Sequence, residues 1–114
     1  MENNESIILI TGDRMGSGSD ELGKILIKSF ISSLTELPLP PNAVIFVNSG
    51  VQLAAEGSNV IADLQALSGK GTKILSCGTC VNYYSLGEKL AVGEITNMPT
   101  ITGYLTSTAR LVTL

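Results

Sequence analysis

The chain has 114 residues, a formal net charge of −3 and no histidine. Apolar residues make up 44% and charged residues 15%, a composition typical of a folded domain with an aliphatic core. Lysine and arginine form no cluster, which argues against nucleic-acid binding and against binding to an anionic membrane surface. No apolar run approaches the roughly 20 residues of a membrane span. Without histidine, the chain alone builds neither a Ser-His-Asp nor a Cys-His mechanism, nor an ordinary histidine-containing zinc site.

The first half of the chain alternates between strand and helix patterns. An aliphatic run at residues 7–10 indicates a buried strand of a parallel sheet. Apolar residues then recur about every 3.6 positions from Leu22 to Leu37, after an N-cap at Ser19 and before a proline-rich stop. A second strand is predicted at residues 43–47, and a second helix from Ser58 to Gly69 or Gly71.

The second half continues the same alternation. A third strand is predicted at residues 73–76, followed by a short helix that begins within residues 78–80 and ends near Gly87. A weaker strand at 93–96, a helix from Asn97 or Pro99, and a last strand at 111–114 complete the pattern. The order predicts a three-layer α/β/α fold with a mostly parallel five-stranded sheet.

We predict a polar tail over residues 1–5 and one domain over residues 6–114. The start of the chain is acidic and lacks the features of a secretory signal, so we expect a cytoplasmic protein. In that compartment, two cysteines three residues apart are better explained by redox, sulfur or metal chemistry than by a structural disulfide.

A candidate site lies where the first three strands end, because ligands of open parallel sheets gather beyond the carboxyl ends of the strands. The third strand runs into Cys77-Gly78-Thr79-Cys80, and the other two run into loops of small and polar residues. We predict that all three loops line one crevice. The expected substrate contacts are Asp13, Arg14, Asn48, Ser49, Gly78 and Thr79.

The two cysteines are the candidate catalytic residues. A thiol at a strand-to-helix junction is expected to have a lowered pKa, because free backbone N–H groups and the helix dipole stabilise its negative charge. We expect Cys77 to be the more exposed of the two and to act as the nucleophile. Cys80 is expected to be better packed, as an accessory or resolving thiol. The alternative is a pair of buried thiols that only pack in the core.

Three other motifs fail on inspection. The run Gly18–Lys24 has Walker A spacing, but Ile25 stands where magnesium coordination needs Ser or Thr. Met98-Pro99-Thr100 is similar to the proline segment of thioredoxin-like proteins, but Pro99 is predicted to open a helix. A metal on Cys77 and Cys80 needs two further ligands, which only a second subunit supplies. We therefore expect no resident cofactor or metal.

Several segments together carry a family resemblance: Ile8–Gly16, Asp20–Phe30, Phe46–Val51, Glu56–Ser58, Leu75–Cys80, Tyr83-Tyr84 and Val92–Met98. Over nearly its whole length the chain resembles the DsrE/DsrF-like family, and within it the DsrE-like domain of YedF-type selenium-metabolism proteins. The resemblance implies a homo-oligomer active in sulfur relay. It also implies a cysteine after the third strand that carries a persulfide, at the position of Cys77, and TusA-like sulfur donor or acceptor proteins as partners.

The sequence is compatible with three functions. The first is a sulfur carrier with a persulfide on Cys77, and the second is a dithiol/disulfide redox module that uses the CxxC spacing. The third is a non-catalytic oligomeric binding subunit, suggested by the lack of an acid–base residue next to the thiols. The resemblance favours the first.

Overall fold

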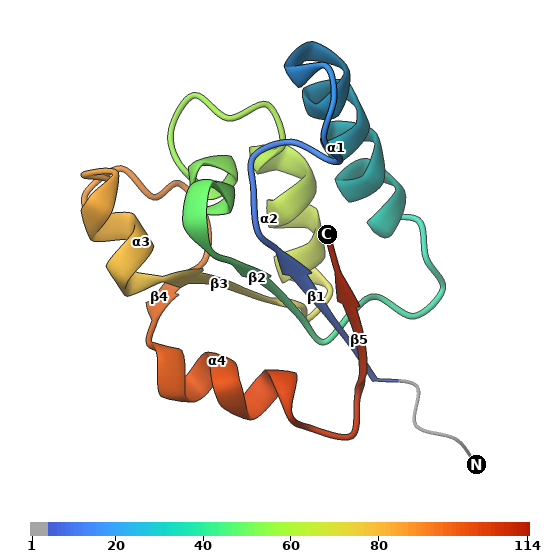
Figure 1. Ribbon diagram of the computed structural model, residues 1–114. Helices are drawn as coiled ribbons and strands as arrows, with labels where there is room; N and C mark the ends of the chain where they lie inside the picture. The colour runs from blue at the N-terminus through green and yellow to red at the C-terminus, as the bar shows by residue number, and fades with distance from the viewer. Residues whose placement is uncertain (1–4) are drawn as a thin grey trace.

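The computed structural model describes residues 5–114, in which five strands form one sheet (Figure 1). The strands are β1 (Ser6–Ile10), β2 (Ala43–Phe46), β3 (Lys73–Cys77), β4 (Glu94–Thr96) and β5 (Arg110–Thr113). They lie in the order β4-β3-β2-β1-β5, and every neighbouring pair is parallel. The predicted α/β architecture is confirmed, with a sheet that is parallel throughout. The predicted tail, apart from Glu5, lies outside the described residues.

The helices connect successive strands, as the alternating pattern predicted. They are α1 (Asp20–Leu34), the 3-10 helix η1 (Asn48–Ala54), α2 (Ile61–Gly69), α3 (Gly78–Tyr83) and α4 (Met98–Leu105). No sequence pattern predicted η1, because a 3-10 turn lacks the 3.6-residue spacing of an α-helix. The third helix is also shorter than predicted, since it ends at Tyr83 and not near Gly87. No helix within residues 5–114 is long and apolar enough to cross a membrane.

Two helices, α1 and α4, begin with side-chain caps. The side chain of Ser19 accepts a hydrogen bond from the Leu22 amide at the start of α1, and Asn97 accepts one from the Thr100 amide at the start of α4. Each bond satisfies an amide that has no partner within its own helix. The cap at Ser19 was predicted from the sequence, and the start of α4 lies within the predicted range of Asn97 or Pro99.

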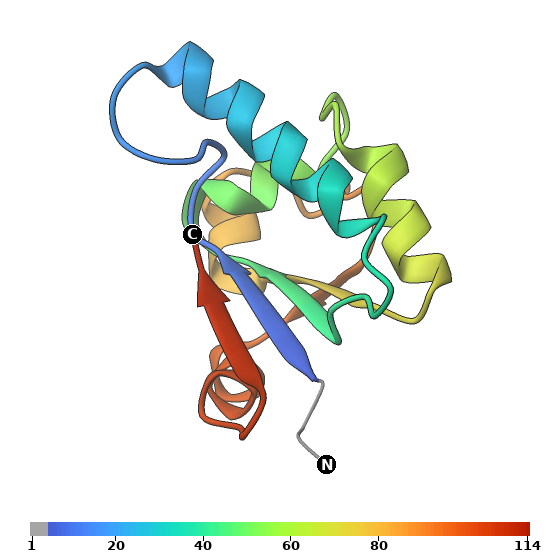
Figure 2. The same ribbon diagram turned by 90° about the vertical axis from the view of Figure 1, so that its right-hand side faces the viewer.

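The sheet is covered unequally on its two faces. Figure 2 shows α1 and α2 together on one face and α4 alone on the other. Side chains alternate between the faces along a strand, so Ile8 and Ile10 pack under α1 and α2 while Ile7 packs toward α4. The core on the α1 and α2 side is the larger. The core on the α4 side consists of Ile7, Ala43, Ile45, Leu75, Cys77 and Ile101.

Gly50 lets η1 pack directly against the end of β1. A Cβ atom at this position would lie 2.5 Å from the carbonyl oxygen of Ile10, closer than any side chain allows. The Val47 amide donates to that same carbonyl at 3.0 Å, which ties the end of β2 to β1. The lack of a side chain at Gly50 therefore fixes where η1 sits above the carboxyl end of the sheet.

We expect Gly50→Ala to lower the free energy of unfolding by about 1–3 kcal/mol, because the new methyl group overlaps the Ile10 carbonyl. Gly69→Ala is the matched control, since nothing lies within 4 Å of its added Cβ at the end of α2. That variant should gain about 0.4–1 kcal/mol by restricting the unfolded chain. Urea unfolding followed by circular dichroism measures both, and equal effects of the two substitutions would contradict the close approach.

Candidate functional site

The turn from β3 into α3 places the two cysteines. Cys77 is both the last residue of β3 and the N-cap of α3, with an extended backbone at φ −63° and ψ 125°. Gly78 then starts the helix, and a Cβ there would lie 3.1 Å from the Thr96 carbonyl oxygen. The turn is therefore pressed against β4, and Cys80 follows one helical turn after the strand ends.

The exposure of the two thiols is the reverse of the prediction. Cys77 is only 2% exposed and packs in the core on the α4 side, whereas Cys80 is half-buried and contacts both cores. The cause is strand alternation: Cys77 lies on the same face of β3 as Leu75, and α4 covers that face. The expectation that Cys77 is the more exposed thiol is therefore wrong. Both cysteines are free thiols.

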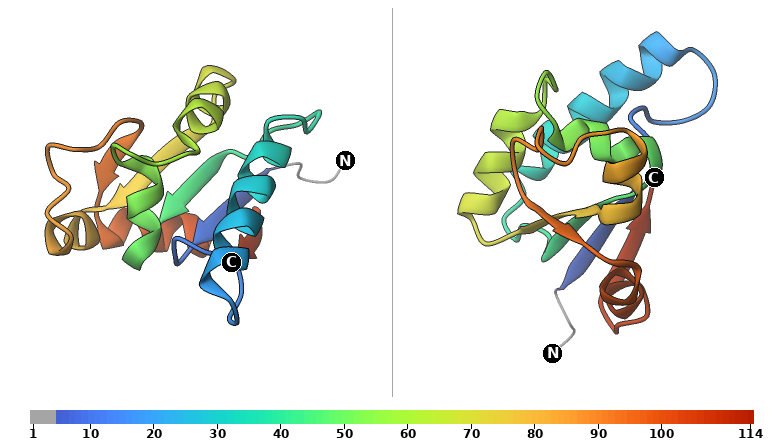
Figure 3. Two further views of the ribbon diagram at one scale, coloured as in Figure 1. Left: turned by 90° about the horizontal axis from the view of Figure 1, so that it is seen from above. Right: turned by 90° about the vertical axis from the view of Figure 1, so that its left-hand side faces the viewer.

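The Cys80 sulfur accepts a hydrogen bond from the backbone of the neighbouring loop. The Asn48 amide donates to Cys80 Sγ at 3.0 Å, and the Tyr84 hydroxyl donates to Asn48 Oδ1 at 3.3 Å. Asn48 begins η1 with φ 54°, in the left-handed region. Figure 3 shows η1 and α3 next to each other at this edge, as expected for elements that follow the paired strands β2 and β3.

Cys80 opens into a surface pocket of about 500 Å³. The Tyr83 side chain, 80% exposed, meets the Tyr84 ring edge to face, with centroids 5.1 Å apart and an interplanar angle of 85°. The residues that line the pocket are Val47, Asn48, Thr79, Cys80, Tyr83 and Tyr84. None of them is an acidic or basic residue, so the pocket offers a ligand shape, apolar contact and hydrogen bonds and no ion pair.

Burial raises the pKa of the Cys80 thiol above the ordinary value. The Asn48 amide acts in the opposite direction and lowers this pKa, while the neighbouring Cys77 thiol raises it. For Cys80 the prediction of a lowered pKa at the junction is therefore wrong. The physical reason is that the loss of solvation is the largest influence on this thiol and outweighs the hydrogen bond from the Asn48 amide.

The other predicted contacts form a separate cluster. The Asp13 amide donates to Ser49 Oγ at 3.2 Å, and Arg14 Nε pairs with the Asp13 carboxylate at 3.0 Å. Arg14 also pairs with Asp20 at the start of α1. These residues join the loop after β1 to η1 and α1, and none of them lines the Cys80 pocket.

Of the predicted site residues, the structure thus brings Asn48, Thr79 and Cys80 together at one pocket. Cys77 lies in the core on the α4 side of the sheet, and Gly78 packs against β4. The prediction identified no role for Tyr84, which was noted only as part of the family resemblance. Its spacing is the signal that was available: four residues after Cys80 on a helix, Tyr84 shares a face with the thiol.

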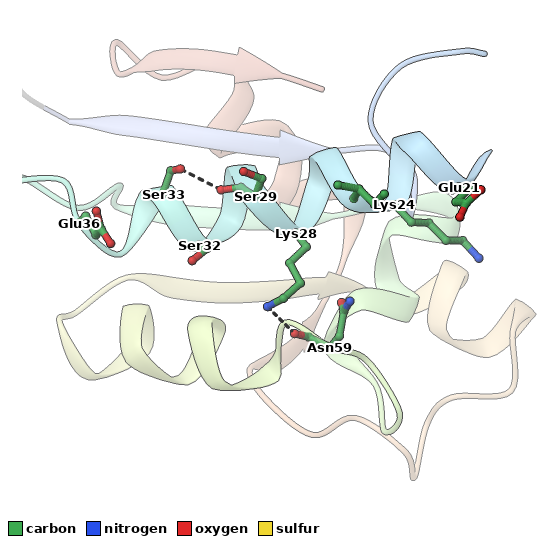
Figure 4. Close-up of a pocket in the computed structure, with 9 residues that line it drawn as sticks. Glu21, Lys24, Lys28, Ser29, Ser32, Ser33, Glu36 and Asn59 are labelled. Carbon is green, nitrogen blue, oxygen red and sulfur yellow. Dashed lines mark hydrogen bonds between the residues drawn. The ribbon is translucent and has the colours of Figure 1, made fainter. Parts of the chain in front are cut away.

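A larger pocket, of about 590 Å³, runs along the outer face of α1 (Figure 4). The Lys28 ammonium donates to the Asn59 carbonyl at 3.0 Å, and the Ser33 hydroxyl donates to the Ser29 carbonyl at 2.8 Å. These side chains therefore bind the backbone of the chain itself, and the pocket contains no thiol. Within residues 5–114, no group of three or more His, Cys, Asp or Glu side chains gathers as a metal cluster.

The fold is shared with solved structures of distant sequence. The MTH1491 protein of unknown function from Methanobacterium thermoautotrophicum aligns with 98% of this chain and 100% of its own, at a TM-score of 0.73 and 18% identity. The YchN protein from E. coli aligns over 96% of this chain and 98% of its own, with a TM-score of 0.71 and 16% identity. For BT1422, a conserved protein of unknown function from Bacteroides thetaiotaomicron, the shares are 97% and 96%, the TM-score 0.67 and the identity 13%.

These neighbours place the chain in a structural class. They share its architecture of a parallel five-stranded sheet with helices on both faces, and in this chain the cysteine turn lies at the carboxyl edge of that sheet. By sequence, the chain matches no protein-family model and no curated protein. The structural similarity therefore establishes the fold alone.

We expect iodoacetamide to alkylate Cys80 faster than Cys77 in the folded protein, because only Cys80 opens to solvent. The rate at Cys80 should rise with pH to a midpoint above that of a free cysteine peptide, since a raised pKa keeps the thiol protonated at neutral pH. Quenched time courses with tandem mass spectrometry separate the two sites. Urea-unfolded protein, in which the rates should converge, is the control; faster modification of Cys77 in the folded protein would contradict the assignment.

Proposed function

We propose that this protein is a sulfur carrier of the DsrE/DsrF-like family, closest to the DsrE-like domain of YedF-type proteins. It holds sulfane sulfur, or selenium in the same form, as a persulfide at the Cys77-Gly78-Thr79-Cys80 turn. The observation that carries the proposal is the half-buried, free Cys80 thiol, which opens into an uncharged pocket while a backbone amide donates to its sulfur. Burial of Cys77 favours Cys80 as the sulfur that meets the donor.

The chemistry requires only the thiol and a donor persulfide. The Cys80 thiolate attacks the outer sulfur of a donor R–S–SH, so that a bond forms from Cys80 Sγ to that sulfur while the S–S bond of the donor breaks. The donor leaves as the thiolate R–S⁻, and the transferred sulfur keeps its proton. An acceptor thiolate reverses the step by attacking the outer sulfur of the Cys80 persulfide, which restores the Cys80 thiolate.

This transfer fits a site without an acid–base group. A thiolate attacks and a thiolate leaves, so no imidazole or carboxylate has to move a proton during the exchange. The chain contains no histidine, and no charged residue lines the pocket.

The surroundings of the thiol suit delivery by another protein. Tyr83, Ile95 and Met98 are large apolar side chains exposed by 80%, 52% and 53% near this end of the sheet. Exposed apolar side chains of this kind are characteristic of protein interfaces. We propose TusA-like proteins as donor or acceptor. A homo-oligomer in the cytoplasm is part of the same proposal, supported by further exposed apolar residues on α1, which are Leu22, Ile25 and Leu26.

Incubation with a persulfidated TusA-like protein should add one sulfur atom to Cys80, seen as a mass gain on the peptide that carries the turn. Cys80→Ser should abolish the gain. Cys77→Ser should load at least as fast as wild type, because the Cys77 thiol raises the pKa of Cys80. The assignment to Cys80 is overturned if Cys80→Ser still loads and Cys77→Ser does not, and sulfur carriage itself is overturned if neither cysteine gains sulfur.

A dithiol/disulfide role is the second candidate, favoured by the interaction between the Cys77 and Cys80 side chains. Oxidised glutathione would take two electrons and leave as two glutathione thiols, and a Cys77–Cys80 bond would form. We expect both cysteines to stay reduced in glutathione buffers at cytosolic poise, because Cys77 is buried and closure of the bond must move it. Thiol trapping and mass spectrometry measure this, and full conversion to the disulfide would favour the redox role.

A further inference from the structure

Asn48 adopts a backbone conformation that most residues avoid. Its φ of 54° is positive, which among the described non-glycine residues is shared only with Ser85. A side chain in the left-handed region clashes with its own backbone, although asparagine tolerates this better than most residues. Strain of this kind persists only where surrounding contacts hold it, and it gathers at functional sites.

The Asn48 amide binds a group outside its own helix. Asn48 is the first residue of η1, so its N–H has no carbonyl within that helix to bind. The extended backbone of Val47 (φ −131°, ψ 162°) sets the plane of the Val47–Asn48 peptide, and the amide donates to Cys80 Sγ on α3 at 3.0 Å. An N–H on the sulfur stabilises the thiolate more than the neutral thiol.

Tyr84 binds the side chain of Asn48. Its hydroxyl donates to Asn48 Oδ1 at 3.3 Å, and its ring packs against the larger core. Tyr84 and Cys80 are four residues apart at the end of one short helix, so both face η1. Asn48 is thus held twice by α3, once through its backbone amide and once through its side chain.

We propose that Tyr84 is a positioning residue for the Cys80 thiol. By binding the Asn48 side chain, its hydroxyl holds the Asn48 Cα, and with it the Val47–Asn48 peptide whose amide donates to the sulfur. The inference rests on the proposed function in one respect, namely that Cys80 Sγ is the sulfur that accepts and releases the cargo. In this role Tyr84 acts on the sulfur through Asn48.

The amide acts on both directions of sulfur transfer. In loading, it increases the fraction of Cys80 present as the attacking thiolate. In release, the acceptor takes the outer sulfur and Cys80 Sγ departs as a thiolate, so the same hydrogen bond stabilises the leaving group. Loss of the Tyr84 hydroxyl should therefore slow loading and release together.

The test is the pH profile of Cys80 alkylation by iodoacetamide, without any sulfur donor. Tyr84→Phe should move the midpoint to higher pH and slow the reaction at neutral pH roughly five-fold, the factor of one net hydrogen bond. Tyr104→Phe is the matched control: it removes a phenol hydroxyl from α4, on the other face of the sheet, and should leave the profile at wild type. Thermal unfolding by circular dichroism confirms that each variant is folded.

Asn48→Gly separates the positioning role from a general structural one. Glycine enters the left-handed region without strain and keeps the amide, but it has no side chain for Tyr84 to hold. In the Asn48→Gly background, Tyr84→Phe should therefore cause no further change in the profile. An equal five-fold loss in both backgrounds would show that Tyr84 acts independently of Asn48 and would overturn the proposal.

The outcomes also separate this inference from the proposed function. A wild-type profile for folded Tyr84→Phe overturns the positioning role, whether or not Cys80 carries sulfur. A shifted profile that depends on Asn48, in a protein that gains no mass from a persulfide donor, supports the positioning role and overturns sulfur carriage alone.

Discussion

The turn at the end of β3 is the constraint on which the site depends. Gly78 brings this turn close to the Thr96 carbonyl, where a Cβ atom would lie only 3.1 Å from the oxygen, and this close approach positions the start of α3. Cys77 is then directed under α4 as the last residue of a covered strand, while Cys80 faces η1 one helical turn later. Two cysteines of the same local motif thereby acquire different environments: Cys77 is a core residue and Cys80 is an accessible thiol.

Opposing effects set the pKa of the Cys80 thiol. Burial raises the pKa of Cys80, and the Asn48 amide lowers it, with burial the larger influence. A thiol kept mostly protonated is less prone to indiscriminate oxidation, since reactivity follows the thiolate fraction. The uncharged pocket adds selection by shape and apolar contact. This combination suits a site that exchanges sulfur with a docked partner better than a site that performs acid–base catalysis.

The ionic cluster near the first strand has a supporting position. Ser49 follows Asn48 in η1 and accepts the Asp13 amide, and Gly50 packs against the Ile10 carbonyl. The loop after β1 and the end of β1 thus hold the first turn of η1 on two sides. Because Asn48 begins that turn, these contacts determine where its amide can point. Asp13 and Ser49 thus support the fold of the site.

The sequence by itself determined the strands, the capped helices and the placement of Cys77 and Cys80 at the carboxyl edge, because burial periodicity and capping are local properties of the chain. Asn48 and Thr79 were predicted at the site because they lie in the loops that follow the second and third strands. Only the tertiary structure decided which thiol is accessible, because that depends on which face α4 covers. It also decided the left-handed turn at Asn48 and its bond to Tyr84, since two elements 36 residues apart must pack before either contact exists.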